Sequence, residues 1–390
     1  MQTQLRKVKK YIDELECSAR YCNQVEVDGV SFFNCDYKSG QQIPSLDKFK
    51  PFGKGEYWGT GWDTHAWFHF KLTVPAHMKK EGLSLQLHIG TDTCDDTWDP
   101  NNPQFLIYID GKLRQGMDIN HQYIELDPNA NNDIYLYAYT GARVDKSRLF
   151  LTLRNVNNEV ESLWYDLKVP FEVLELLDDK THEYASILKY LYEAVSILDF
   201  YDIGSEEFFD SVRKAKKYIQ DEFYNGYCKT QPETVICIGH THIDCAWVWT
   251  LKQTREKVQR SFCTVLDLMK KYPEYKFMSS QPHLYKALKE EAPEKFEEIK
   301  QRVKEGRWEC EGAMWVEADC NLSSGESLVR QVLYGKRFFK NEFGVNSRVL
   351  WLPDVFGYSA ALPQILKKSG VDWFVTSKIS WNDTNTMPYA

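Results

Sequence analysis

The sequence predicts a protein of several domains, in which an all-β part precedes an α/β part. Two observations predict this arrangement. Between about residues 40 and 175, short apolar segments are separated by turn residues. From residue 234 onward, segments typical of strands alternate with segments typical of helices. A length of 390 residues leaves room for two or three such domains.

The all-β part is predicted from short strands at regular spacing. Segment 83–89 alternates apolar and polar residues, and segment 105–109 is followed by Asp110-Gly111, a hairpin signal. This pattern favours an antiparallel β-sandwich. Trp58 and Trp62 would stack on a glycan if exposed, although packing against the neighbouring domain is the commoner use of such rings. The predicted strands are 66–74, 83–89, 105–109, 133–138 and 148–153.

A helical connector is predicted next. Segment 184–198 repeats apolar residues three and four positions apart, and Ser205 precedes two glutamates in the manner of a helix N-cap. We therefore divide the chain into an N-terminal segment (1–39), a β-sandwich (40–177), a helical connector (178–232) and an α/β part (233–390).

The α/β part is predicted to hold a parallel sheet with right-handed crossovers, because strands and helices alternate in it. The expected strands are 235–238, 276–278, 307–309, 349–352 and 373–375, and the expected helices are 254–271, 294–305 and 327–343.

Candidate metal ligands follow the first of these strands. The run His240-Thr-His242-Ile-Asp244 comes directly after the apolar segment 235–238, which we expect to be a strand buried on both faces. Side chains two residues apart in extended chain share one side, and imidazole with carboxylate suits a divalent ion such as zinc. Ligands of α/β sheets bind beyond the carboxyl ends of the strands.

A second acid follows another strand in the same way. Asp354 comes after 349–352, within Pro353-Asp354-Val-Phe356-Gly357-Tyr-Ser359, and a predicted helix follows it. An isolated aspartate here would usually serve a turn, but this one is expected at the same sheet edge as the His/Asp cluster.

Composition narrows the class of protein. The net charge of −8 and the lack of a basic patch argue against nucleic acid as a partner. No apolar stretch is long enough to cross a membrane, and no secretory signal is visible. The ten cysteines lack disulfide or zinc-finger spacing, so we expect reduced thiols in a cytoplasmic protein.

Four motifs together resemble glycoside hydrolase family 38, the class II α-mannosidases, in its long bacterial and cytosolic form. They run in order from residue 235 to the end of the chain. They are His240-x-His242-x-Asp244-x-x-Trp247, Trp315-Val-Glu317-Ala-Asp319, Pro353-Asp354-x-Phe356-Gly357-x-Ser359 and Ser380-Trp381-Asn382-Asp383-Thr-Asn385.

The resemblance implies roles for individual residues. His242, Asp244 and Asp354 match metal ligands, and Asp354 also matches the nucleophile of a retaining mechanism. Trp247 and Phe356 match aromatic residues of the mannose subsite. Glu317 and Asp319 match an acidic motif, which we assign to substrate binding. The motif does not make His240 a ligand.

The resemblance also implies the fold, the cofactor and the partners. The β-sandwich is expected to be jelly-roll-like, and the α/β part to be the first portion of a seven-stranded (β/α) barrel-like catalytic domain. One divalent metal is expected, with zinc first and cobalt, manganese or calcium as alternatives. The partner is a mannose-containing glycan, and self-association into a homo-oligomer is expected of this family.

One departure from the family pattern leads to a further expectation. In the family, the acid/base carboxyl and a further histidine ligand lie well downstream of the nucleophile motif, beyond residue 390. We therefore expect this chain to be an N-terminal portion of a longer enzyme, and by itself to bind metal weakly and hydrolyse little or nothing. Two alternatives stay open, a different metal-dependent carbohydrate hydrolase or deacetylase and a non-catalytic glycan-binding module. The sequence does not specify the mannosidic linkage.

Overall fold

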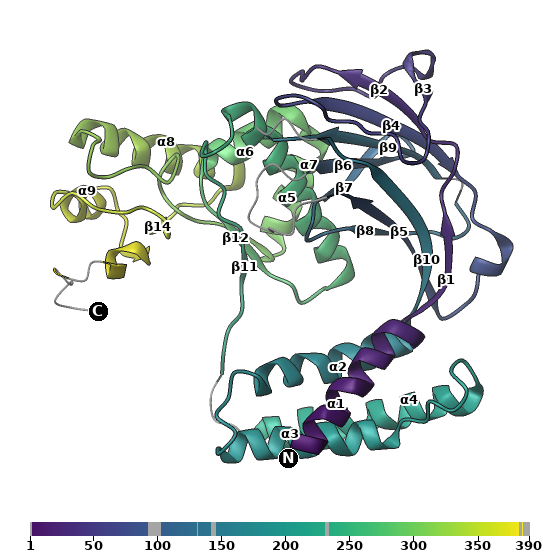
Figure 1. The fold of residues 1–390 in the computed structure, drawn as a ribbon. Coiled ribbons are helices and arrows are strands. Elements are labelled where there is room, and N and C mark those ends of the chain that lie inside the picture. Colours follow the sequence, from purple (N-terminus) through teal and green to yellow (C-terminus); the bar gives the residue numbers. More distant parts are fainter. Residues whose placement is uncertain are drawn as a thin grey trace.

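The computed structural model describes residues 2–92, 103–130, 132–141, 146–230, 234–381 and 384. These residues form a β-sandwich, a helical unit that includes the first helix of the chain, and an α/β part (Figure 1). The predicted fold class, an antiparallel jelly-roll-like sandwich followed by a parallel α/β part, is confirmed.

The sandwich consists of two antiparallel sheets that face each other. One sheet has the order β1-β10-β5-β8, and the other has the order β3-β2-β4-β9-β6-β7. The strands are β1 (Tyr21–Glu26), β2 (Ser31–Cys35), β3 (Lys50–Pro51), β4 (His65–Leu72), β5 (Leu83–Thr91), β6 (Gln104–Ile109), β7 (Lys112–Met117), β8 (Tyr123–Leu126), β9 (Asn132–Tyr139) and β10 (Leu149–Asn157).

Strand β9 shows that side chains on both faces of the second sheet are buried. Ile134 and Leu136 point between the sheets into the sandwich core, whereas Tyr135 and Tyr137 point the other way and are also buried. Alternation along a strand explains the two sets. The second set is buried because the α/β part covers the outer face of this sheet.

The two tryptophans considered for glycan stacking have different surroundings. Trp58 is buried in the core of the sandwich, where its ring meets Phe68 at a centroid distance of 5.4 Å. Trp62 is 65% exposed. Trp58 is therefore neither a glycan platform nor a contact with the neighbouring domain, because the sandwich itself encloses it.

The helical unit packs around its own core. It contains α1 (Gln2–Glu14), α2 (Asn158–Leu174), α3 (His182–Ile197) and α4 (Glu206–Tyr218). Buried residues from all four helices meet in it, among them Val8, Leu163, Leu191 and Val212. The predicted helices near 184 and 205 are α3 and α4, with Thr181 and Ser205 as N-caps. The sequence analysis did not identify α1 or α2.

The α/β part is built from parallel strands in sequence order. Its strands are β11 (Gly239–His240), β12 (Phe277–Ser279), β13 (Trp308–Cys310), β14 (Val349–Leu352) and β15 (Trp373–Thr376). β11, β12 and β13 form one parallel sheet and β14 with β15 another, and a parallel bridge between Gly312 and Leu350 connects them. The described strands do not close into a barrel.

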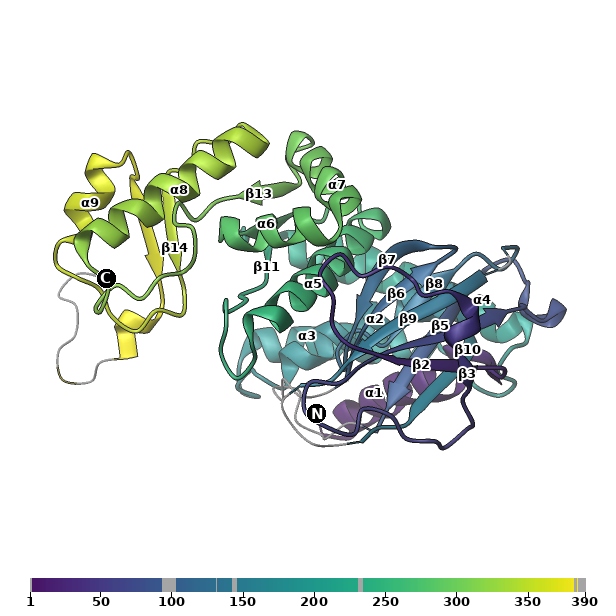
Figure 2. The ribbon, with the colours of Figure 1, turned by 90° about the horizontal axis from the view of Figure 1, so that it is seen from above.

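The helices of this part are α5 (Leu251–Lys271), α6 (Pro282–Glu291), α7 (Pro293–Lys304), α8 (Gly325–Phe343) and α9 (Leu362–Lys368). Seen from above, α5 to α7 lie next to the sandwich, and α8, α9 and β14 lie on their far side (Figure 2). None of the helices in the described ranges has the length and apolar character needed to cross a membrane.

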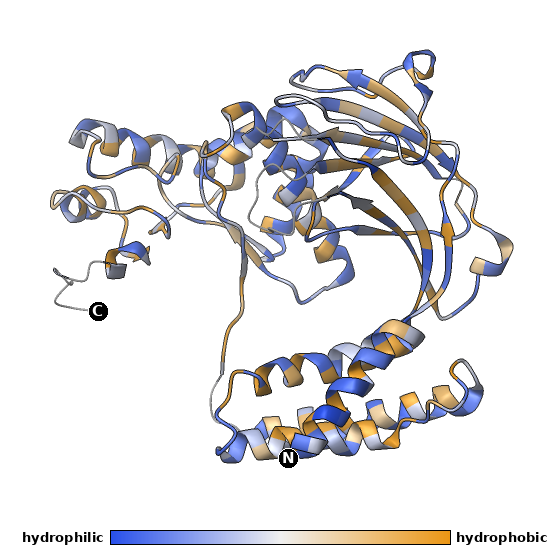
Figure 3. Cartoon of the chain, viewed as in Figure 1, coloured by the Kyte–Doolittle hydropathy of each residue, from blue (hydrophilic) through white to orange (hydrophobic). Residues whose placement is uncertain are grey.

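The predicted strand 235–238 is wrong. Only Gly239 and His240 pair with β12, whereas Val235 and Ile236 are 81% and 84% exposed. Figure 3 shows this run as an apolar extended segment between the helical unit and β11. β11 is an edge strand of its sheet, and no described element covers the residues that precede it. The prediction from apolar composition alone therefore overestimated both the burial and the strand pairing of this segment.

Helix α5 joins the α/β part to the sandwich. The Glu256 side chain is completely buried, and its Oε1 accepts hydrogen bonds from His65 Nε2 at 2.8 Å and from Tyr137 Oη at 2.9 Å. Farther along α5, Thr264 Oγ1 donates to the Gly116 carbonyl at 3.1 Å. A buried carboxylate is tolerated only when hydrogen bonds replace its hydration, so these contacts specify how the two parts meet.

Replacing Tyr137 with phenylalanine tests this interface. Tyr137→Phe removes one of the two donors to Glu256 and leaves the buried carboxylate less satisfied. We expect the free energy of unfolding to fall by about 1–3 kcal/mol, measured by urea denaturation. Tyr201→Phe serves as a control because Tyr201 is 97% exposed. Equal unfolding midpoints for both variants would contradict the proposed importance of this hydrogen bond.

Candidate metal centre

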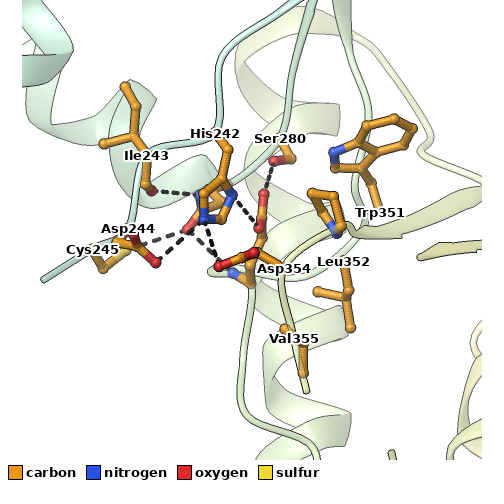
Figure 4. A network of polar contacts seen from close by, with 12 residues as sticks. His242, Ile243, Asp244, Cys245, Ser280, Trp351, Leu352, Asp354 and Val355 are labelled. Carbon is orange, nitrogen blue, oxygen red and sulfur yellow. Dashed lines mark hydrogen bonds and ion pairs between the residues drawn. The ribbon is translucent and has the colours of Figure 1, made fainter. Parts of the chain in front are cut away.

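Polar side chains gather where the parallel strands end. His242 and Asp244 follow β11, Ser280 follows β12, Asp354 follows β14 and Lys378 follows β15. Figure 4 shows the first four around one space. The carboxyl ends of parallel strands form one edge of a sheet, so residues distant in sequence meet there. The cavity at this edge has a volume of about 260 Å³.

Three potential metal ligands meet at the centre of this space. His242 Nε2 lies 3.3 Å from Asp244 Oδ1 and 3.7 Å from Asp354 Oδ2. The candidate ligand atoms of these three residues lie within 4.8 Å of one another. One imidazole nitrogen and two carboxylate oxygens are a donor set that zinc accepts at about 2.0–2.2 Å. The three side chains therefore fit a divalent ion after a small inward movement.

His240 lies in the same motif but faces other partners. Its Nδ1 donates to the Met278 carbonyl at 3.0 Å, and Trp351 Nε1 donates to its Nε2 at 3.2 Å. Residues 241–244 are not in a strand, so the two-residue alternation does not extend through the motif. His242 and Asp244 come together in a loop, while both ring nitrogens of His240 are engaged.

A buried carboxylate lies behind His242. Glu317, in the loop between β13 and α8, has a side chain only 5% exposed, and its Oε2 is 2.8 Å from His242 Nδ1. Ser280 Oγ donates to the other oxygen, Oε1, at 2.8 Å. The carboxylate thus occupies the side of the imidazole opposite Asp244 and Asp354.

Gln281 connects the loops that carry these residues. Its Nε2 donates to the Ile243 carbonyl at 2.9 Å, and its Oε1 accepts from the Glu317 backbone N–H at 3.2 Å. Gln281 is buried and has a φ of 61°, a left-handed conformation that is unfavourable for residues other than glycine. Several hydrogen bonds thus maintain a strained backbone at the centre of the site, as is typical of functional positions.

The charges around His242 change its protonation. Burial lowers the pKa of His242, but hydrogen bonds to the carboxylates of Asp244 and Glu317 outweigh this effect and raise its pKa to about 10. In the metal-free protein the imidazole is therefore a cation at neutral pH. It supplies the positive charge that the surrounding carboxylates require.

Lys378 supplies a second positive charge. Its Nζ is 2.8 Å from Asp354 Oδ1, the oxygen that does not face His242. The same Nζ lies 3.5 Å from the ring centroid of Trp381 and 5.2 Å from that of Phe356. Asp354 therefore presents one oxygen to the candidate metal position and the other to a lysine held by aromatic rings.

The remaining predicted site residues lie around this centre. Phe356, Glu317 and Asp319 line the cavity, and Phe356 is 73% exposed. Asp319 Oδ1 accepts from the backbone N–H groups of Asn321 and Leu322, as a turn aspartate does. Trp247 is 64% exposed, packs edge-on against Trp249 and does not line the cavity. Asn382, Asp383 and Asn385 lie outside the described residues.

Sequence reasoning missed Ser280, Gln281 and Lys378. All three follow predicted strands, at 276–278 and 373–375, and so occupy the edge where ligands are expected. That position was the available signal. Serine, glutamine and lysine are common at surfaces, and their types alone did not distinguish them from solvated residues.

Comparison with known proteins agrees with the resemblance to glycoside hydrolase family 38. Residues 232–390 match the family described as "Glycosyl hydrolases family 38 N-terminal domain", and residues 23–143 match "Alpha-mannosidase, jelly roll domain". The C-terminal part of the chain is thus similar to the N-terminal domain of glycosyl hydrolases of family 38, and the part before it is similar to an α-mannosidase jelly roll.

Three curated relatives show how far the similarity extends. Alpha-mannosidase G of Dictyostelium discoideum is 32% identical over 393 residues, which cover 94% of this chain and 33% of that protein. Alpha-mannosidase 2C1 of Homo sapiens is 29% identical over 417 residues, which cover 99% and 38%. Alpha-mannosidase of Saccharomyces cerevisiae is 40% identical over 191 residues, which cover 46% and 18%. The chain thus spans at most 38% of the length of these relatives.

Replacing Lys378 with methionine tests the electrostatics of the site. Lys378→Met removes a cation 2.8 Å from Asp354 and keeps an apolar side chain against the aromatic rings. A divalent ion should then bind more tightly, by roughly threefold to tenfold, because the repulsion between the two cations is lost. Zinc affinity is measured by competition with a chromogenic chelator. Weaker binding would instead mean that Lys378 is needed to hold Asp354 in place.

Proposed function

We propose that this protein is a metal-dependent retaining α-mannosidase that acts on mannose-containing glycans. The observation that carries the proposal is the meeting of His242, Asp244 and Asp354 at one sheet edge, in a part of the chain that is similar to the family 38 N-terminal domain. The relatives' names, which are all alpha-mannosidase, support the substrate class.

Asp354 is proposed as the nucleophile. One of its oxygens attacks the anomeric carbon of the mannosyl residue while the bond from that carbon to the leaving oxygen breaks, and an acid carboxyl gives its proton to the leaving oxygen. The product is a mannosyl ester of Asp354. Water then attacks the same carbon, gives one proton to the carboxylate that the acid left behind, and releases mannose and the free Asp354 carboxylate, so that two inversions retain the configuration.

Other residues bind the sugar and the ion. His242, Asp244 and Asp354 would hold one divalent ion, with zinc first and cobalt, manganese or calcium as alternatives. When bound, such an ion acts as a Lewis acid and a template for sugar hydroxyls. Phe356 lines the cavity and offers an apolar face to the sugar ring, and Trp247, Glu317 and Asp319 remain predicted substrate contacts.

A cytoplasmic location is part of the proposal. All nine cysteines within the described residues are free thiols, and Cys94 lies outside them. Unpaired cysteines in this number are typical of a reducing compartment. Self-association into a homo-oligomer is also proposed, on the family resemblance alone.

The nucleophile assignment is tested by replacing Asp354 in the full-length protein that the natural reading frame encodes. Asp354→Ala should lower release of nitrophenol from p-nitrophenyl α-mannoside by roughly a thousandfold or more, because the glycosyl ester can no longer form. Asp372→Asn, which changes an exposed acid near β15, is the control and should keep full activity. Normal turnover by Asp354→Ala would refute the assignment, and turnover that survives chelation would refute the metal dependence.

The proposed site also predicts that metal binding depends on pH. The ligand nitrogen must be neutral, yet the pKa of His242 in the metal-free protein is about 10. Zinc therefore has to displace one proton, and its affinity should rise about tenfold per pH unit below that pKa. Titration calorimetry in buffers of different ionisation enthalpy measures the proton released. An affinity that stays constant between about pH 6 and pH 8 would contradict this prediction.

A further inference from the structure

The carboxylate of Glu317 is buried beside the candidate ligands but is not one of the three that converge. Its side chain is 5% exposed, less than the 35% of Asp244 and the 37% of Asp354. Burying a carboxylate is costly unless polar partners replace its water. Within the described residues its side-chain partners are Ser280 and His242. The contacts with these two residues are therefore what offsets the cost of burying the Glu317 carboxylate.

The two ring nitrogens of His242 face different partners. Nδ1 is 2.8 Å from Glu317 Oε2, whereas Nε2 faces Asp244 Oδ1 at 3.3 Å and Asp354 Oδ2 at 3.7 Å. The buried atoms Nδ1 and Glu317 Oε2 both lack a partner with full hydrogen-bond geometry among the described residues, so the 2.8 Å contact is the interaction available to each. A carboxylate at this distance favours a proton on Nδ1 and leaves Nε2 to face the centre of the site.

Strand β12 fixes Glu317 in turn. Ser280 Oγ donates to Glu317 Oε1 at 2.8 Å, and Gln281 Oε1 accepts the Glu317 backbone N–H at 3.2 Å. A Cβ at position 312 would lie 2.6 Å from Ser280 Cβ, so glycine leaves room for Ser280. These contacts limit the rotation and displacement of the carboxylate.

We propose that Glu317 is a positioning residue, which orients His242 so that Nε2 is the metal-binding atom, and that Ser280 holds Glu317 for this task. This inference rests on the metal site of the proposed function and assigns Glu317 a role different from contact with the sugar. A fixed carboxylate behind a ligating histidine sets the tautomer and increases the basicity of the ligand nitrogen.

Zinc affinity, measured by chelator competition on the metal-free full-length product of the reading frame, tests the proposal. Glu317→Ala should raise the zinc dissociation constant by about tenfold to a hundredfold, the range for such outer partners. Glu317→Gln should recover part of this loss, because its amide oxygen can accept from Nδ1 and its amide nitrogen can donate to Ser280. Ser280→Ala should have a smaller effect. Glu326→Gln, an exposed glutamate of the same α/β part, should leave the constant unchanged.

A spectroscopic measurement separates positioning from a general structural role. In the zinc-loaded chain with ¹⁵N-labelled histidine, His242 should show a slowly exchanging Nδ1–H proton and a metal-bound Nε2. Glu317→Ala should lose the slow exchange. If this variant does not fold, the nearly isosteric Glu317→Gln is compared instead, and its neutral acceptor should give an Nδ1–H exchange faster than in the wild type. Zinc bound through Nδ1 in the wild-type chain would overturn the proposal.

The failure of this inference differs from failure of the proposed function. If the folded wild-type protein, produced as the full-length product of the reading frame, does not bind zinc, the metal site itself is wrong, and the inference is overturned with it. If the wild type binds zinc and Asp244→Ala abolishes binding, but Glu317→Ala binds as tightly as the wild type, the metal site stands and only the positioning role is overturned.

Discussion

The buried hydrogen bonds of Glu256 determine how the parts of this protein are assembled. This residue of α5 is enclosed between the α/β part and the sandwich, with His65 and Tyr137 as donors. The same helix begins just after the loop of the metal ligands, and Thr254 Oγ1 donates to the Cys245 carbonyl at 2.5 Å. Helix α5 is therefore bonded at once to the sandwich and to the loop that carries His242 and Asp244. The sandwich supports the candidate site through α5.

The candidate site itself is governed by unbalanced charge. Asp244, Glu317 and Asp354 bring three carboxylates close to one imidazole, and within the described residues Lys378 is the lysine or arginine paired with them. Like charges at this separation repel, so the raised pKa of His242 is a direct consequence of the arrangement. A divalent ion would relieve the repulsion more fully than a proton does. The strained backbone of Gln281 indicates that the loops are held in place before an ion binds.

Much of the fold was predictable because its signals are local. Alternation in 83–89, the hairpin signal after 105–109 and periodicity in 184–198 identify elements without knowledge of their partners. The convergence of His242 with Asp354 was predictable from topology, since both follow parallel strands. Burial was harder to predict, because it depends on partners distant in sequence. Segment 235–238 is apolar yet exposed, whereas Tyr137 of β9 is buried where it meets Glu256 of α5.

The inner partners of the ligands could not be identified from sequence for a related reason. Ser280 and Glu317 are 37 residues apart, and only the pairing of β11, β12 and β13 brings their loops together. The central position of β12 explains why its end supplies Ser280 and Gln281, since it is the strand with neighbours on both sides. A serine and a glutamine there contact the loops of both neighbours without binding an ion themselves. In this arrangement the loops after β11 and β14 supply the candidate ligands, and the loops after β12 and β13 supply the contacts that orient them. Substitutions after β12 should therefore alter metal affinity without removing any ligand.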